Sequence, residues 1–138
     1  MQVTFITTPE LFEQKFHLAA PLLQPVIDQA ARGEFTVEDI RRMTEAGRVI
    51  TALIEKDGKA VLAMAFEFIH YPQKLAVNIL ALGGQSVDEA ASEFWETFKE
   101  WCRSTGASAI EASCSDAMAR LLRRQEFKSV YRVVRLEL

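Results

Sequence analysis

Residues Leu75–Glu89 read LAVNILALGGQSVDE, and this stretch decides the fold. The run Leu75–Leu82 predicts a β-strand whose far end is apolar on both faces, as in the centre of a sheet. Gly83-Gly84 is predicted to break that strand, and Ser86-Val87-Asp88-Glu89 has the form of a capping box. The stretch therefore predicts a buried strand that is followed at once by a helix.

The predicted helix carries one apolar stripe, which is typical of a helix packed on a sheet. The residues of the stripe are Ala91, Phe94, Trp95, Phe98, Trp101 and Cys102. Gly106 is predicted to end the helix, and Ala109–Ser113 is predicted to form the next strand. The segment from Leu82 to Ala109 is long enough for a crossover between two parallel strands.

A β-hairpin is predicted before this unit. Strands at Arg48–Lys56 and Ala60–His70 flank Asp57-Gly58, a pair that favours a type I′ turn. Tyr71–Lys74 makes the next turn, so that Leu75 begins a third antiparallel strand.

The N-terminal region predicts a short strand and then helices. Gln2–Ile6 has the strand pattern, and Thr8 is a suitable N-cap for the helix that follows. Pro21 and Pro25 lie within the helical pattern, and proline removes a helix hydrogen bond. We therefore expect a break near Ala20 and a second helical stretch after it.

Two more helix starts and one more strand complete the prediction. Thr36-Val37-Glu38-Asp39 is a variant capping box, Ser115 is an N-cap, and Lys128–Leu138 reads as a closing strand whose edge could pair with a second copy. We predict one α/β domain over residues 1–138, with α+β character. Its central mixed β-sheet has about six strands flanked by helices.

Bulk properties exclude several function classes. The chain has 138 residues, which suits one domain, and a net charge of −3, which gives no reason to expect a nucleic-acid or membrane partner. Two cysteines are too few for a disulfide framework, so a reduced, cytoplasmic setting is expected. The N-terminus is too short and polar to read as a signal peptide, and no apolar run approaches the roughly 20 residues of a membrane helix.

The order of elements resembles the GNAT superfamily of N-acetyltransferases. In that family the strand equivalent to Leu75–Leu82 hydrogen-bonds the pantetheine arm of acyl-CoA, and the loop after it offers N–H groups to the pyrophosphate at a helix start. Segment Ser115–Phe127 is similar to the family's late motif. The resemblance implies acetyl-CoA as cofactor. It assigns the binding of acetyl-CoA to Leu80, Ala81, Leu82, Gly83, Gly84, Gln85 and Ser86.

The sequence departs from the family pattern at two places. The family loop normally reads Gln or Arg, two residues, Gly, any residue, then Gly or Ala, whereas this chain has only Gly83-Gly84. Leu122 stands where the family has a tyrosine general acid, and Glu126 replaces a glycine. Small acetyltransferase-like proteins of tailed phages show similar erosion.

Amine acetylation needs a base, and two residues of the hairpin are candidates for that catalytic role. If Tyr71–Lys74 is the loop, then Glu67 lies opposite Asn78 and His70 lies opposite Leu75. A carboxylate among apolar neighbours has a raised pKa when it is buried. The alternatives are a solvated Glu67 beside Asn78 and a His70 that is simply exposed at a strand end.

Other polar residues have weaker claims. Arg120, Arg123 and Arg124 share a helix face, which would suit a grip on the CoA ribose phosphate or another anion, or a solvated surface. No histidine is placed by sequence to activate Cys114, so we do not expect a cysteine nucleophile. No spacing of His, Cys, Asp or Glu indicates a metal site.

Two hypotheses on function follow. The first is an acyl-CoA-dependent N-acyltransferase, or an eroded descendant, in which an amine attacks the thioester directly. The second is a non-catalytic protein that keeps the fold as a structural or interaction module with a protein partner, for example in a phage particle. The short loop and Leu122 favour the second, while the central strand is neutral because folding alone requires it. Both hypotheses allow a homo-oligomer.

Overall fold

The computed structural model describes residues 1–85 and 87–138, and of residues 87–90 only the backbone. Within this part of the chain, five strands form one sheet in chain order. The strands are β1 (Gln2–Ile6), β2 (Ile50–Lys56), β3 (Lys59–His70), β4 (Leu75–Gly84) and β5 (Ala109–Ala112). The helices are α1 (Pro9–Ala30), α2 (Val37–Glu45), α3 (Val87–Ser104) and α4 (Asp116–Arg123).

The sheet is mixed, as predicted. Strands β1 to β4 pair antiparallel, and β5 pairs parallel to β4. The β2–β3 turn has positive φ at both central residues, 54° at Asp57 and 76° at Gly58, which confirms the type I′ signature. None of the helices that the structure describes combines the length and the apolar character needed to span a bilayer.

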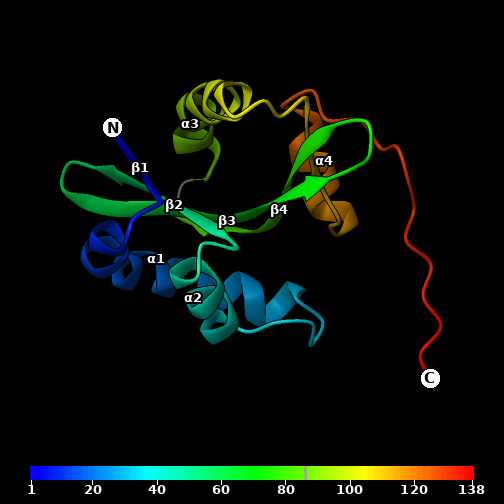
Figure 1. Cartoon of the computed structure of the whole chain (residues 1–138), viewed down its shortest axis with the longest axis horizontal. Helices are drawn as coiled ribbons and strands as arrows, with labels where there is room; N and C mark the ends of the chain where they lie inside the picture. Colours follow the sequence, from blue (N-terminus) through cyan, green and yellow to red (C-terminus); the bar gives the residue numbers. More distant parts are fainter. Residues whose placement is uncertain (86) are drawn as a thin grey trace.

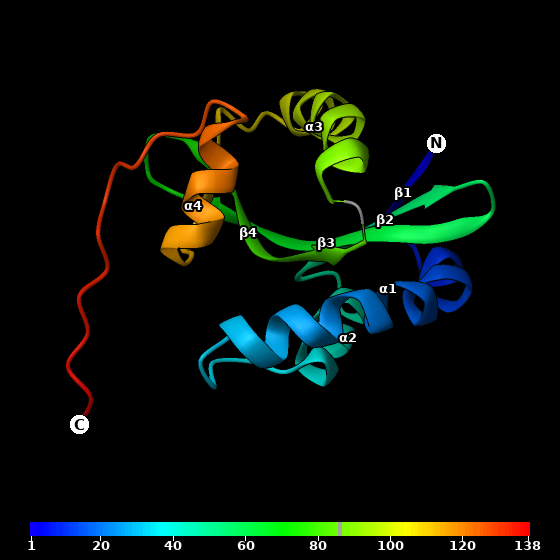
Figure 2. The same ribbon diagram turned by 180° about the vertical axis from the view of Figure 1, so that it is seen from behind.

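Helices cover both faces of the sheet (Figure 1, Figure 2). Helices α1 and α2 bury one core with Phe16, Leu23 and Ile40 against the sheet. Helices α3 and α4 bury a second core on the opposite face, in which Phe94 and Phe98 pack on the sheet. Burying one such side chain contributes about 1.5–3 kcal/mol, so both faces are well anchored.

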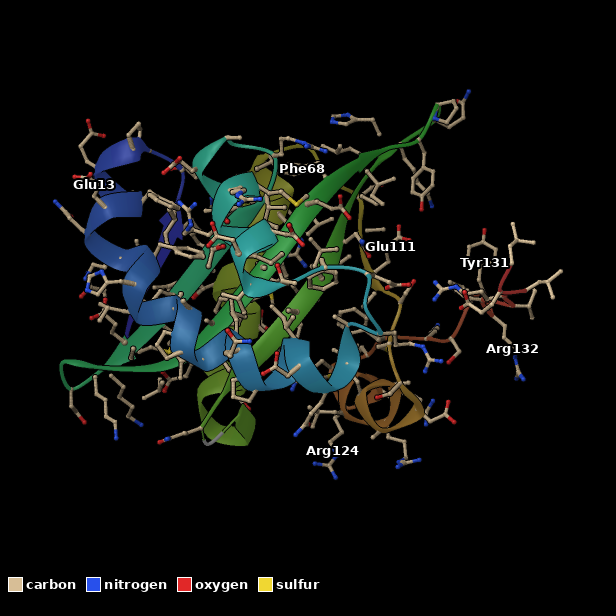
Figure 3. The ribbon with its side chains drawn as sticks, turned by 90° about the horizontal axis from the view of Figure 1, so that it is seen from below. Glu13, Phe68, Glu111, Arg124, Tyr131 and Arg132 are labelled. Carbon is tan, nitrogen blue, oxygen red and sulfur yellow. The ribbon has the colours of Figure 1, made fainter. Side chains whose placement is uncertain are left out.

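Helix α1 is continuous, and the break expected near Ala20 is wrong. The helix runs through Pro21 and Pro25, although it changes direction along its length (Figure 3). Its buried side chains lie on both sides of the two prolines: Phe16, Ala19, Leu23 and Ile27. Packing this stripe on the sheet outweighs the hydrogen bonds that the prolines remove.

The local helix starts follow the sequence prediction. Thr36 accepts a hydrogen bond from the Asp39 amide at 3.1 Å, and the Asp39 carboxylate accepts one from the Thr36 amide at 2.9 Å, which confirms the capping box. Ser115 accepts a hydrogen bond from the Met118 amide at 3.2 Å and caps α4. Ser86, the predicted cap of α3, lies outside the described residues.

Gly83 and Gly84 continue β4, so the predicted strand break at this pair is wrong. A Cβ on Gly83 would come within 2.3 Å of the Leu22 carbonyl oxygen of α1, and one on Gly84 would come within 2.2 Å of the Val61 carbonyl oxygen. Both distances are far shorter than any real contact of a Cβ atom. The two glycines are therefore required because α1 and β3 lie so close to the backbone of β4.

Segment 128–138, which was predicted to be the closing strand, is not a strand in this structure. It leaves the body after α4 as an exposed extension (Figure 1, Figure 2). The described sheet therefore has five strands instead of about six. The sequence pattern is that of a strand, but a strand also requires a neighbouring backbone, and the segment has none here.

We predict that Gly83→Ala lowers the free energy of unfolding by about 2–3 kcal/mol, because the added methyl group forces α1 away from β4. Chemical denaturation monitored by circular dichroism measures this loss. The control is Gly33→Ala, where no atom lies within 4 Å and only a φ of +77° opposes the substitution. The control should lose about 1 kcal/mol. If the Gly83→Ala protein were as stable as the control, this would contradict the close packing of α1 on β4.

Candidate functional site

The last part of β4 has a strand on one side only. Strand β5 pairs with β4 over Ala76–Ile79, whereas β3 pairs with it as far as Gly84. In the described part of the chain, no strand therefore faces the β5 side of β4 from Leu80 onward. Backbone polar groups on such an open side are available to an extended ligand that adds to the sheet.

A β-bulge lies in β4 just beyond the end of its pairing with β5. Phe66 pairs with Ile79 and Ala65 pairs with Ala81, so Leu80 is an extra residue in β4. Leu80 and Ala81 both belong to the core under α1, whereas Ile79 belongs to the core under α3. Bulges bend a strand and are common next to active sites, because they redirect backbone and side-chain groups.

A pocket of about 240 Å³ lies beside this open side of β4, between α3 and α4. Its lining residues are Leu82, Ala91, Ser92, Trp95, Leu121, Leu122, Arg124 and Gln125. Leu82, Ala91, Trp95, Leu121 and Leu122 supply apolar walls, while Ser92 of α3 and Arg124 and Gln125 at the end of α4 supply polar groups. Figure 3 shows Arg124 extending from α4 to the outer surface of the molecule.

The predicted cofactor residues converge on this region. Leu80–Gly84 form the open end of β4, Gln85 follows it directly, and α3 begins at Val87. The N-terminus of a helix carries a partial positive charge and favours an anion. Leu122 stands where the family that the sequence resembles has a tyrosine. It is 5% exposed and forms part of the pocket wall.

Glu67, one of the two predicted catalytic residues, lies near the bulge but on the other face of the sheet. Glu67 pairs across the strands with Asn78, as expected, and accepts a hydrogen bond from Asn78 Nδ2 at 3.0 Å. Its strand neighbours Ala63 and Ala65 lie in the core under α1. Glu67 is half-buried, so it is neither a fully buried carboxylate nor a freely solvated one.

His70 is exposed at the end of β3, away from the bulge, and pairs with Leu75 as predicted. Its neighbour Tyr71 is 41% exposed and donates a hydrogen bond to the Glu111 carboxylate of β5, at 3.0 and 3.1 Å from its two oxygens. This hydrogen bond raises the pKa of Tyr71, because it stabilises the neutral phenol. The contact joins the β3–β4 turn to β5.

Neither cysteine has the environment of a nucleophile. Burial raises the pKa of the Cys102 thiol to about 12. Cys114 is exposed, and its pKa is raised by partial desolvation and then by the charge of Asp116. Among the residues that the structure describes, no group of three or more His, Cys, Asp or Glu residues is placed to hold a metal ion.

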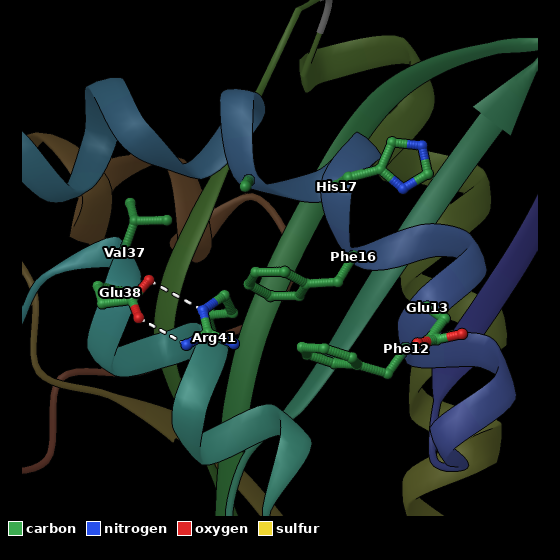
Figure 4. A pocket seen from close by; sticks show the side chains of 8 residues that line it. Phe12, Glu13, Phe16, His17, Val37, Glu38 and Arg41 are labelled. Carbon is green, nitrogen blue, oxygen red and sulfur yellow. Dashed lines mark hydrogen bonds and ion pairs between the residues drawn. The ribbon is translucent and has the colours of Figure 1, made fainter.

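A larger hollow of about 480 Å³ lies between α1 and α2 (Figure 4). Stacked rings of Phe12 and Phe16 form part of its wall, with centroids 5.1 Å apart. Arg41 and Glu38 also line the hollow, and they form an ion pair in which Arg41 Nη2 lies 2.6 Å from Glu38 Oε1. None of the residues predicted to be catalytic or to bind the cofactor lines this hollow.

Sequence reasoning missed three features of the site. Trp95 was predicted only as a core residue, yet it also lines the pocket between α3 and α4. Gln125 was not singled out, and no sequence signal marks it. The bulge at Leu80 is hidden because Ile79–Leu82 is apolar on both faces, so the alternation that would reveal an extra residue is absent.

The fold matches known acetyltransferase structures over almost the whole chain. One is a probable acetyltransferase (TM-score 0.75, 13% identity, covering 100% of this chain and 98% of that chain). Another is an aminoglycoside acetyltransferase from an uncultured soil metagenomic sample, in complex with sisomicin (TM-score 0.73, 12% identity, covering 99% and 94%). A third is a GNAT family acetyltransferase from Staphylococcus aureus (TM-score 0.63, 13% identity, covering 100% of both chains).

No protein-family model and no curated protein sequence matches the chain. With identities of 12–13%, the similarity to these three structures is one of fold. It confirms the predicted GNAT-like α/β fold, with its mixed sheet and flanking helices.

We predict that a disulfide reagent at pH 8 modifies Cys114 in the folded protein and reaches Cys102 only after unfolding. With a pKa of about 12, the Cys102 thiol is ionised at pH 8 in about one molecule in ten thousand, and it is also buried. Mass spectrometry of the modified protein identifies the site. Rapid labelling of Cys102 under native conditions would contradict the packing of α3 described above.

Proposed function

We propose that the chain is an acyl-CoA-dependent N-acyltransferase that transfers an acetyl group directly to an amine. The observation that carries this proposal is the open side of β4 at Leu80–Gly84, which lies beside the pocket between α3 and α4. A pantetheine arm is an extended chain with two amide groups, and it could add to this side of β4 as a strand does.

The proposed cofactor site consists of Leu80–Gln85, together with the start of α3. Ser86 is included in the proposed site only because of its position in the sequence, between Gln85 and the start of α3. The apolar part of the pocket would hold the methylene groups of the arm, while the N-terminus of α3 and Arg124 would face the phosphates.

We place the proposed reaction at the bulge, just beyond Ile79, where the pairing of β4 with β5 ends. The thioester would lie at the bulge, and the amine would approach from the α1 face, where Glu67 lies. Asn78 holds the Glu67 carboxylate through the 3.0 Å hydrogen bond, so Glu67 is the proposed base. His70 is the weaker candidate, because it is exposed at the far end of the strand.

In the proposed step, the amine nitrogen attacks the thioester carbon and the C–N bond forms. The nitrogen loses a proton to Glu67, directly or through water, and the C–S bond then breaks. Leu122 stands at the position of the family's acid and has no proton to donate. We therefore expect the departing thiolate to take its proton from solvent.

We predict that 1 mM acetyl-CoA raises the melting temperature of the protein. A site with a Kd of about 10 μM stabilises the fold by about 2.7 kcal/mol at this concentration, which corresponds to a shift of several degrees. Differential scanning calorimetry with acetyl-CoA and with CoA measures the shift.

Two arginine variants sharpen this test. Arg124→Glu should reduce the shift, because Arg124 lines the pocket, whereas Arg48→Glu should keep it, because Arg48 is exposed just before β2. The absence of any shift at millimolar ligand would rule out the proposed function.

We predict that Glu67→Gln lowers kcat/KM about 10²–10⁴-fold, because glutamine cannot accept the proton. The KM for acetyl-CoA should stay unchanged, since Glu67 lies on the other face from the pocket. Release of the CoA thiol, with sisomicin and simple primary amines as acceptor probes, measures the rate.

The matched control is Glu100→Gln, which removes an equal charge from an exposed position on α3. It should keep full activity. Full activity in Glu67→Gln would show that the base is another residue, and His70→Asn would then be the next variant to assay.

A further inference from the structure

Most of the large apolar side chains that are exposed to solvent in the described chain belong to segment 128–138. They are Val130, Tyr131, Val133, Val134, Leu136 and Leu138, each 68–117% exposed. Among the side chains that the structure describes outside the segment, only the large apolar residues Met1 and Tyr71 are also exposed, at 49% and 41%. Apolar side chains in such number along one segment indicate a surface that is covered in the working protein.

The pattern of the segment is that of a β-strand. Valines and leucines at Val130, Val134, Leu136 and Leu138 fall on one face of an extended chain, because side chains alternate between faces. Tyr131 and Val133 fall on the other face. The segment contains no proline and no glycine, so all of its backbone groups are free to pair in a sheet.

The outer edge of β5 is a suitable partner for such a strand. In the described part of the chain, no strand lies beyond β5, and its four residues are only half-buried. The segment carries Lys128, Arg132 and Arg135 against one acidic residue, and β5 carries Glu111. The opposite edge, β1, has no charged residue, so charge favours β5.

Within one chain the segment does not lie alongside β5. It crosses the edge of the sheet and reaches the loop after α1, where Arg135 pairs with Glu34 (Figure 1, Figure 2). Tyr131 and Arg132 accordingly lie beyond Glu111, outside the body of the molecule (Figure 3). At its start, the segment is fixed by Phe127, whose ring packs on Trp95 at 5.5 Å. The strand-forming part therefore points outward from its own sheet.

We propose that segment 128–138 of one copy pairs as a β-strand with the outer edge of β5 in a second copy. Two chains related by a two-fold axis make this contact twice, so both exposed segments and both open edges are covered in one dimer. A four-residue β5 can satisfy the backbone of only a few residues. The remaining apolar residues of each segment pack against the partner's surface beside that edge.

The experiment compares the native chain with Val134→Glu/Leu136→Glu by analytical ultracentrifugation over a range of concentrations. The native chain should sediment with twice the chain mass of 15.6 kDa. The double variant should raise the dimer Kd about 100-fold or more, because two charges replace buried apolar side chains. The matched control is Gln14→Glu/Gln29→Glu, which adds the same charge at exposed positions of α1 and should leave the Kd unchanged.

Hydrogen exchange on the same proteins identifies the pairing partner. Amides of β5 and of segment 128–138 should be protected together in the dimer and should lose protection together on dilution or in the double variant. Circular dichroism confirms that the variants remain folded. A monomeric native chain would overturn the proposal, including one whose segment folds back on its own β5. A dimer that survives the double variant, or one without protection of β5, would overturn it equally.

Discussion

Backbone pairing is the constraint on which the rest of this structure depends, because each strand edge must find a partner for its amide and carbonyl groups. Strands β1 to β4 pair with one another through backbone hydrogen bonds in an antiparallel meander. Three open stretches remain in the described chain: the outer side of β1, the far part of β4 from Leu80 to Gly84, and the outer side of β5. The open part of β4 suits a small extended ligand, and the outer side of β5 suits a strand of protein. The proposed chemistry thus depends on the end of β5 at Ala112, and the proposed assembly depends on the lack of a described strand beyond β5.

Much of the local structure could be predicted, because short-range hydrogen bonds and steric rules determine it. Thr36 and Asp39 cap each other as their spacing requires, and Asp57-Gly58 turns with positive φ at both residues. The four-residue turn after His70 sets the register that brings Glu67 opposite Asn78. A candidate base and its hydrogen-bond partner could therefore be paired from the sequence alone, since a hairpin register follows from its turn.

Contacts between distant residues account for what the sequence did not reveal. The prolines of α1 indicated a break, but burial of Leu23 and Ile27 against the sheet maintains a single helix. The glycine pair looked like a turn, whereas the Leu22 carbonyl oxygen of α1 explains the glycine at Gly83. Segment 128–138 has strand composition without a strand's neighbour, and no local pattern reports whether a neighbour exists. The pocket between α3 and α4 likewise arises only when helices far apart in the sequence pack together.

The bulge in β4 has a consequence for how the length of this strand can vary. Ile79 and Leu82 both face α3, with Leu80 and Ala81 between them on the other face. If Leu80 were deleted, ordinary alternation would still direct Ile79 and Leu82 toward α3 and Ala81 toward α1. The other side chains of both cores would thus keep their faces in a shorter strand, and only the packing of Leu80 under α1 would be lost. The additional residue is not needed for the alternation of β4, so its presence can follow what the open side of the strand has to hold.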